Sequence, residues 1–338
     1  MHYHSIFPLK LQVKFPISQE INAGFFRRAG QNRKNQEAIY MQDPAFRTDL
    51  AMEAREAAGE IPGVEMTKEQ AAGAEIVRVR VRTKEGADAL GKPLGTYVTL
   101  THPGLCAGEV RAEGALAARL AQEIAVLLPL REGAGVLLVG LGNRRLTPDS
   151  LGPRAAGAAL VTRHLHKALP QLRPVSAILP GVTGETGLET GELVAAVCRA
   201  FHPEAVLALD ALAARSAERL LTTVQIADAG VAPGSGVGNH RAALTREELG
   251  VPVVAVGIPT VIHASTILRD ALERIAGEAG ARVDACGLAE DLGAGDLLVT
   301  PAGIDEQVRA ASALLADAID LALHAPLTLA DIRAIRGE

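Results

Sequence analysis

The stretch that decides the fold is "GVLLVGLGNRRLTPDSLGP", residues 135–153. It begins with an unbroken apolar run, which is typical of a strand buried on both faces of a sheet. Gly140 and Gly142 then form a Gly-x-Gly turn. Arg145 stands where a dinucleotide-binding turn has its third glycine, and the Gly-Lys-Ser/Thr of a phosphate-binding loop is missing. The pattern therefore disfavours a nucleotide site.

The loop after this strand carries Asp149. A helix that started at Pro148 would hold Pro153 in its interior, at a cost of about 3 kcal/mol. We therefore predict that Gly152 caps a helix of residues 153–169, with Pro153 at its first position. "NRRLTPDS" becomes a loop at the carboxyl end of the strand. An acid there can simply complement the helix dipole, worth about 0.3–1 kcal/mol, and that explanation stays open.

Three further apolar runs read as buried parallel strands, and Ala- and Leu-rich segments between the runs read as helices. The strands are "VSAILP" (175–180), "AVLALD" (205–210) and "VPVVAVGIP" (251–259); the helices cover about 113–128, 153–169, 187–201, 211–221 and 260–277. This alternation predicts an α/β fold, a mostly parallel twisted sheet with helices on both faces.

The two ends of the chain are expected to differ from this core. "EIVRVRVRT" (75–83) alternates Val and Arg, and with "GTYVTL" (95–100) it predicts a small additional β element near residues 75–101. The run from "DLLVTPAGID" to residue 324 predicts a strand and a long amphipathic helix. Residues 1–49 read as a basic N-terminal extension, with Met41 as a second plausible start, ahead of one domain of residues 50–338.

Composition excludes several function classes. The chain has 338 residues, a net charge of -5, 3% aromatic residues and no Trp, which gives no footprint for direct nucleic-acid binding. Its apolar runs are too short for a membrane span. The three cysteines are widely spaced, which fits a reducing compartment, and Cys198 reads as a core residue. The histidines form no HExxH motif, and we expect no cofactor.

A second acid, Asp210, ends the strand "AVLALD". Ligands of open α/β sheets bind outside the carboxyl ends of strands, so Asp149 and Asp210 are expected to converge there. Two neighbouring carboxyls favour one ionised and one protonated member. Such a pair can activate water and protonate a leaving amine. The alternative is that Asp210 only caps the predicted helix of residues 211–221.

Two weaker candidates lie near the same edge. Arg215 lies just after Asp210 and could bind an acidic group or form an ordinary ion pair. His263 follows the strand of residues 251–259 and could reach the crevice. Glycine-rich loops at 180–190 and 232–241 would let a substrate backbone approach closely.

The chain closely resembles the germination protease family of spore-forming bacteria. The resemblance is carried by "RTDLAMEA", "VGLGNRRLTPDSLGP", "LVTRHLHK", "RPVSAILPGVTGETGLET", "ALDALAARSAERL", "TTVQIADAGVAPGSGVGNHR", "GVPVVAVGIPTV" and "LLVTPAGID". It implies a metal-independent, aspartic-type endopeptidase of the spore cytoplasm that degrades small acid-soluble spore proteins. It also implies a homotetramer and a fold related to hydrogenase-maturation peptidases. Two essential aspartates of the family's "TPD" and "DALAAR" motifs correspond to Asp149 and Asp210.

The family is also made as a zymogen that trims its own N-terminus. Its members cut after an acidic residue and before a large apolar one. "TDLAMEA" has this layout, so the predicted self-cleavage lies between Asp49 and Leu50. The alternative is an ordinary helix start with Thr48 as N-cap. Both can hold if this helix start is frayed and accessible.

Two other functions are alternatives. The first is a hydrogenase-maturation-type peptidase that recognises a metal centre on its substrate. The second is a non-enzymatic binder of acidic metabolites, which two acids in one site disfavour. His263 stands where relatives are expected to carry an acid, so a family role for His263 is in doubt.

Overall fold

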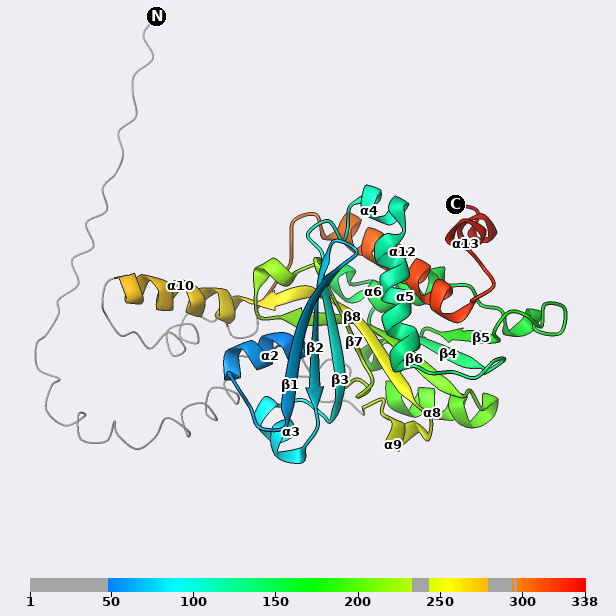
Figure 1. Cartoon of the computed structure of the whole chain (residues 1–338), viewed down its shortest axis with the longest axis horizontal. Coiled ribbons are helices and arrows are strands. Elements are labelled where there is room, and N and C mark those ends of the chain that lie inside the picture. The colour runs from blue at the N-terminus through cyan, green and yellow to red at the C-terminus, as the bar shows by residue number, and fades with distance from the viewer. Residues whose placement is uncertain (1–47, 233–242, 279–293, 295–296) are drawn as a thin grey trace, which may run out of the picture.

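The computed structural model describes residues 48–232, 243–278, 294 and 297–338 (Figure 1). One mixed sheet runs through the molecule in the order β1-β2-β3-β7-β8-β6-β4-β5, with β9 paired to β8. The strands are β1 (Val64–Ala71), β2 (Ala74–Val81), β3 (Gly95–Thr101), β4 (Val136–Gly140), β5 (Val175–Ile178), β6 (Ala205–Ala214), β7 (Thr223–Ala227), β8 (Val253–His263) and β9 (Leu298–Val299). The α/β prediction is confirmed.

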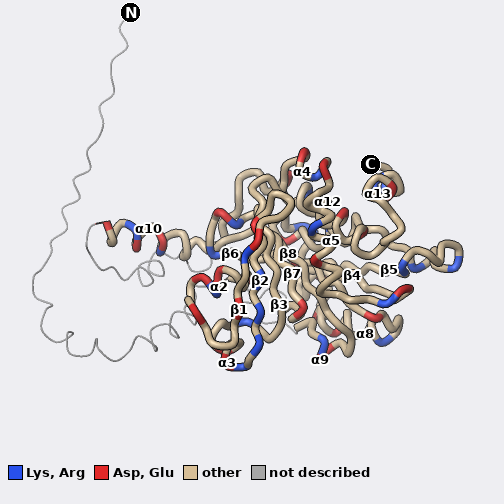
Figure 2. Tube along the Cα trace, viewed as in Figure 1, with Lys and Arg blue, Asp and Glu red and all other residues tan. Residues whose placement is uncertain are grey.

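The sheet has a parallel half and an antiparallel half. β5, β4, β6 and β8 are parallel, as their unbroken apolar runs predict. β7 pairs antiparallel with β8, and β3, β2 and β1 continue antiparallel from it. β1 was not predicted, because its outer face is polar and exposed. Figure 2 shows charges of both signs along β1 and β2, a composition that discourages edge pairing with another chain.

Helices cover both faces of the parallel half. Leu138 and Leu207 lie in one apolar cluster with α5 (Ala115–Leu127), α6 (Leu151–Ala158) and α12 (Ile304–Leu323). Leu137 and Val206, one residue earlier in each strand, face α8 (Thr190–Phe201) in another cluster that also holds Cys198. Successive strand residues point to opposite faces, so fully apolar strands need helices on both sides.

Further helices complete the described part of the chain. They are α2 (Ala51–Ala58), α3 (Lys84–Leu90), α4 (Gly108–Glu113), α7 (Thr183–Thr186), α9 (Arg246–Leu249), α10 (Ala264–Glu278) and α13 (Leu329–Arg336), with 3-10 turns at Thr147–Asp149, Arg163–Leu165 and Ala217–Arg219. None of the helices in the described ranges is both long and apolar enough to cross a bilayer.

The predicted helix of residues 153–169 was wrong at both ends. α6 begins at Leu151 after Ser150 and ends at Ala158. Pro153 is its third residue, a position whose N–H has no acceptor within the helix, so proline costs little there. The expected Gly152 cap is therefore inside the first turn.

The predicted helix of residues 211–221 was also wrong, because β6 continues to Ala214. Alanine favours helices, but this preference is weak and tertiary pairing overrides it. Here β8 supplies the partner, since its register with β6 runs on to Ile262 opposite Ala214. For the same reason β8 extends to His263, and the helix expected from residue 260 starts at Ala264.

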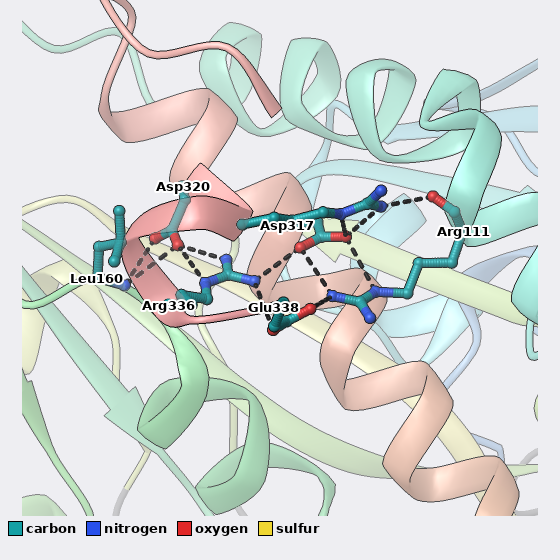
Figure 3. A network of polar contacts seen from close by, with 7 residues as sticks. Arg111, Leu160, Asp317, Asp320, Arg336 and Glu338 are labelled. Atoms are coloured by element: carbon teal, nitrogen blue, oxygen red, sulfur yellow. Dashed lines mark hydrogen bonds and ion pairs between the residues drawn. The ribbon is translucent and has the colours of Figure 1, made fainter. Parts of the chain in front are cut away.

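A buried ionic network joins the C-terminal helices (Figure 3). The side chain of Asp317 is fully buried. It accepts from Arg111 Nε (3.0 Å), Arg333 Nη2 (2.8 Å) and Arg336 Nη1 (2.7 Å). These guanidinium groups and their hydrogen bonds hold the pKa of Asp317 below its usual value, against the effect of burial. The network fixes α13 and α4 on α12.

Asp320, one turn further along α12, extends this network to α6. Its carboxylate pairs with Arg336 and accepts the Leu160 N–H at 2.9 Å. Burial raises the pKa of Asp320, and the Arg336 guanidinium opposes that rise. α12 thereby holds Leu160, the second residue after the end of α6.

Candidate active site

Asp149 ends the 3-10 turn that joins β4 to α6. Its Oδ2 accepts the N–H of Asn143 at 2.7 Å. Gly142 has a φ of 113°, a conformation that side chains rarely tolerate. A Cβ on Gly142 would lie 2.8 Å from Asp149 Oδ1, so the carboxylate packs directly on this glycine. Gly142 of the Gly-x-Gly turn therefore packs against the aspartate, whereas Gly140 leaves room for the first turn of α6.

Asp210 lies within β6, four residues before the end of the strand, and not at the helix start that was expected. It is 7% exposed, and its register partner on β8 is Gly257. Its Oδ1 accepts the N–H of Ala211 at 2.9 Å. The helix-capping explanation for Asp210 is therefore wrong.

Both acids lie where β4 leaves β6. Just past the end of β4, the N–H of Leu141 donates a hydrogen bond of 2.8 Å to Leu209 O on β6. Leu209 precedes Asp210, and Leu141 precedes the Gly142–Asn143 backbone that holds Asp149. β6 runs on past this point, so Asp210 lies beside the end of β4. This shared location makes an aspartate pair geometrically reasonable.

The first turn of α6 packs against the same point. A methyl group on Gly152 would overlap the carbonyl oxygens of Leu209 and Leu141. These are backbone atoms of two central strands and cannot easily move. Close approach of α6 to β4 and β6 therefore requires glycine here.

We expect Gly152→Ala to lower the stability of the protein by about 1–3 kcal/mol through overpacking, and to reduce peptidase activity. Gly157→Ala is the matched control in the same helix, because its Cβ would meet Leu179 at an ordinary 3.9 Å. Urea unfolding of both variants checks the expectation. Equal stabilities of the two variants would contradict it.

Arg215 and His263 lie further along the sheet. Arg215 follows the end of β6, and its guanidinium pairs with Asp270 at 3.1 Å. His263 ends β8 six residues after Gly257, about 20 Å along a strand from the level of Asp210. The structure does not bring these two residues to Asp210, and their role in binding substrate stays a prediction.

The residues on both sides of the predicted processing site are packed against, or hydrogen-bonded to, β6. Leu50 is fully buried and packs with Leu212 and Ala214. Asp49 pairs with Ala213 like a strand neighbour: its N–H donates to Ala213 O at 2.9 Å and its Oδ2 accepts from Ala213 N at 2.8 Å. The expectation of a frayed, accessible helix start was wrong.

Two residues that the sequence analysis missed hold this segment. Lys92 Nζ donates to the carbonyls of Thr48 (2.8 Å) and Asp49 (3.2 Å). Gln225 Nε2 donates to Asp49 O at 2.9 Å, and its Oε1 accepts from Ala51 N at 2.8 Å. The sequence could have indicated a special role for Gln225, because it is an amide in the middle of the apolar strand β7. No sequence feature distinguishes Lys92 from a surface lysine that follows a helix.

Thr48 is not the N-cap of α2, since Leu50 occupies that position. The Thr48 hydroxyl accepts from Leu50 N at 3.0 Å and donates to Glu53. Two N–H groups from the end of β6 also donate to Glu53, those of Arg215 (2.7 Å) and Ser216 (2.9 Å). The N-terminal segment is thus tied to the strand that carries Asp210.

Possible metal ligands and thiols lie among the described residues. Within residues 48–232, 243–278, 294 and 297–338, no group of three or more His, Cys, Asp or Glu side chains could hold a metal ion. Burial raises the pKa of the Cys106 thiol to about 11 and also raises the pKa of Cys198. Both thiols are therefore protonated and poor nucleophiles. The glycine-rich loop of residues 232–241 lies almost wholly outside the described residues.

Comparison with known proteins finds a family match and similar relatives over most of the chain. The family model described as "Germination protease" matches residues 42–285. The germination protease of Caldanaerobacter subterraneus subsp. tengcongensis is 47% identical over 240 residues, 69% of this chain and 74% of the relative. That of Clostridium perfringens is 38% identical over 318 residues, covering 85% and 97%. That of Bacillus subtilis is 44% identical over 246 residues, covering 68% and 67%.

Proposed function

Because this chain belongs to the germination protease family, a family of spore germination endopeptidases, we propose that it starts the degradation of small acid-soluble spore proteins in the cytoplasm of the germinating spore. The observation that carries the proposal is the family match over residues 42–285, which spans both acids and the segment around Leu50. No observation favours the hydrogenase-maturation alternative, and the fold relationship to those peptidases stays a prediction.

The proposed chemistry uses Asp149 and Asp210 as a pair. One carboxylate takes a proton from water while the water oxygen attacks the carbonyl carbon of the peptide. The other, protonated, gives its proton to the leaving nitrogen as the C–N bond breaks. Support comes from their common location where β4 leaves β6 and from the burial of Asp210. Burial favours a protonated carboxyl group, which this scheme needs in one member.

Incubation with a small acid-soluble spore protein, followed by mass mapping of the products, tests the proposed activity. We expect a few discrete cuts, each after an acidic residue and before a large apolar one. A chelator should leave the rate unchanged. Unspecific cuts, or cleavage only in the presence of added metal, would contradict the proposal.

The proposed zymogen is cut between Asp49 and Leu50, and the mature protein assembles as a homotetramer. Since Leu50 is buried and Asp49 is bonded to β6, the segment must open before this bond can be cut. N-terminal sequencing of the matured protein should read Leu50 first. Sedimentation or light scattering checks the tetramer.

We expect Gln225→Ala to accelerate processing. It removes two hydrogen bonds that hold Asp49 and Ala51 closed, worth about 1 kcal/mol each, so the open form should rise by about thirtyfold. Gln70→Ala on the exposed face of β1 is the control. The rate of appearance of the shortened chain is measured by gel electrophoresis. An unchanged rate would show that opening does not limit processing.

A further inference from the structure

Glu53 is a buried acid that the aspartate chemistry does not use. Its side chain is only 6% exposed, and it accepts from the N–H groups of Arg215 and Ser216 and from the hydroxyl of Thr48. A buried carboxylate is tolerated only when it is paired or hydrogen-bonded. If Glu53 loses one of these donors, its buried carboxylate therefore needs a new hydrogen-bond donor or a cation.

The third donor belongs to the segment that processing removes. Thr48 Oγ1 stands between the N–H of Leu50 and the carboxylate of Glu53. Leu50 is the N-cap of α2, and Glu53 is the third residue of that helix. In a capping box, the glutamate at this position accepts the N–H of the N-cap directly. In this chain the threonine hydroxyl occupies the place of that direct bond.

Processing changes both partners at once. Water adds its oxygen to the Asp49 carbonyl carbon, the C–N bond breaks, and the nitrogen of Leu50 receives a proton. The resulting primary amine has an ordinary pKa of about 7.7–8.0 and takes a further proton at neutral pH. Thr48 leaves with the released segment. Glu53 thus loses a hydroxyl donor when Leu50 gains N–H donors and a positive charge.

We propose that Glu53 binds the new α-ammonium group of Leu50, an ion pair that replaces the Thr48 hydroxyl and fixes the mature N-terminus against β6. The inference rests on the proposed cut between Asp49 and Leu50. Leu50 needs no long movement, because it is already held by Leu212 and Ala214. The same carboxylate also holds Arg215 and Ser216, so the mature terminus and the end of β6 share one anchor.

The surrounding charges create a need for an anion beside the new ammonium group. A positive charge at the N-terminus of a helix is unfavourable with respect to the helix dipole, so the ammonium of Leu50 requires a negative partner. The ammonium of Lys92 is a second nearby cation, bonded to the carbonyls of Thr48 and Asp49. Burial lowers the pKa of Lys92, and Asp49 and Glu53 oppose that shift. Asp49 departs on processing, while the Arg215 guanidinium keeps its partner Asp270. Glu53 then has two cations to balance.

The test measures the titration of the Leu50 α-amino group in full-length protein that has processed itself. The wild type, Glu53→Gln and a control, Glu56→Gln, are compared. Glu56 lies on the same helix but is exposed and pairs with Lys68 at 3.0 Å. A variant that fails to process itself is cut by a trace of wild-type enzyme. Modification by cyanate is followed from pH 6 to 10 by the mass of the N-terminal peptide.

In the wild type and the control, we expect the titration midpoint of the Leu50 α-amino group to lie at least one pH unit above its midpoint in the same chain unfolded in urea. Near neutral pH this difference corresponds to about tenfold slower modification by cyanate. Glu53→Gln should return it to the unfolded value. Equal native midpoints in all three proteins would overturn the ion pair. If Glu53→Gln does not fold, the wild-type comparison with and without urea decides alone. If the matured protein begins at a residue other than Leu50, both the proposed processing site and the ion pair are wrong. If it begins at Leu50 but the α-amino group has the same midpoint as in the unfolded chain, only the ion pair is wrong.

Discussion

Asp149→Asn is expected to lower the rate of peptide cleavage by about 10²–10⁴-fold, the usual contribution of a positioned acid or base. The asparagine keeps an oxygen for the N–H of Asn143, so the turn should retain its shape. What it loses is the ability to take or give a proton. The loss should therefore appear in kcat, with the melting temperature close to that of the wild type.

Asp210→Asn should cause a loss of the same order, and the double variant should lose little more than either single one, because the two acids act as a unit. Asp88→Asn, at an exposed position of α3, is the matched control and should cleave normally. Initial rates on a peptide with an acidic residue before its scissile bond provide the measurement. Wild-type rates in either single variant would remove that residue from the chemistry.

Asp317→Ala is expected to destabilise the protein by about 3–5 kcal/mol. It leaves Arg111, Arg333 and Arg336 facing one another without the carboxylate that they share, and breaking a buried ion pair from one side has a cost of this order. The midpoint of urea unfolding should fall accordingly. Glu204→Gln is the control: it breaks a surface pair with Arg131, which solvent screens and which contributes little to stability. Similar midpoints for the two variants would contradict the argument.

The two acids of this network should respond to pH in opposite directions. The pKa of Asp317 is depressed in the folded protein, so its contribution is present above its unfolded pKa and is lost as the pH falls through the folded one. The pKa of Asp320 is raised, so the cost of burying its charge is relieved as the pH falls from its folded pKa to its unfolded pKa of about 3.9. Asp317→Asn should therefore flatten the acid limb of the stability profile. Urea midpoints measured between pH 2.5 and 6 check this.

Much of the fold could be predicted because buried parallel strands have an unmistakable pattern. Runs such as "GVLLVG" need helices on both faces, and the structure supplies them. Local preference failed where tertiary pairing decided the outcome. "ALAA" after Asp210 favours a helix in isolation, yet β8 provides a strand partner as far as Ile262. β1 escaped notice because only one of its eight residues is buried.

The location of the two acids could be predicted from the sequence, but their catalytic role stays a prediction. The strand pattern and the family motifs single out Asp149 and Asp210, and both lie where β4 ends beside β6. The contacts of Asp49 with Ala213 and Gln225 could not be predicted, because they join positions more than 160 residues apart. Burial of Leu50 was missed for the same reason. A helical pattern of eight residues does not reveal which strand the helix start will meet.

The arrangement of α12 bears on the order in which the protein folds. Thr147 Oγ1 donates to Asp305, Ser312 Oγ donates to Leu151 O, and Asp320 accepts from Leu160. Each contact spans about 160 residues, and such distant contacts form slowly because a long loop must close first. Until α12 docks, the Asp149 turn and α6 lack these contacts. Proteolytic competence should therefore emerge at the last stage of folding, which spares neighbouring polypeptides from a half-formed protease.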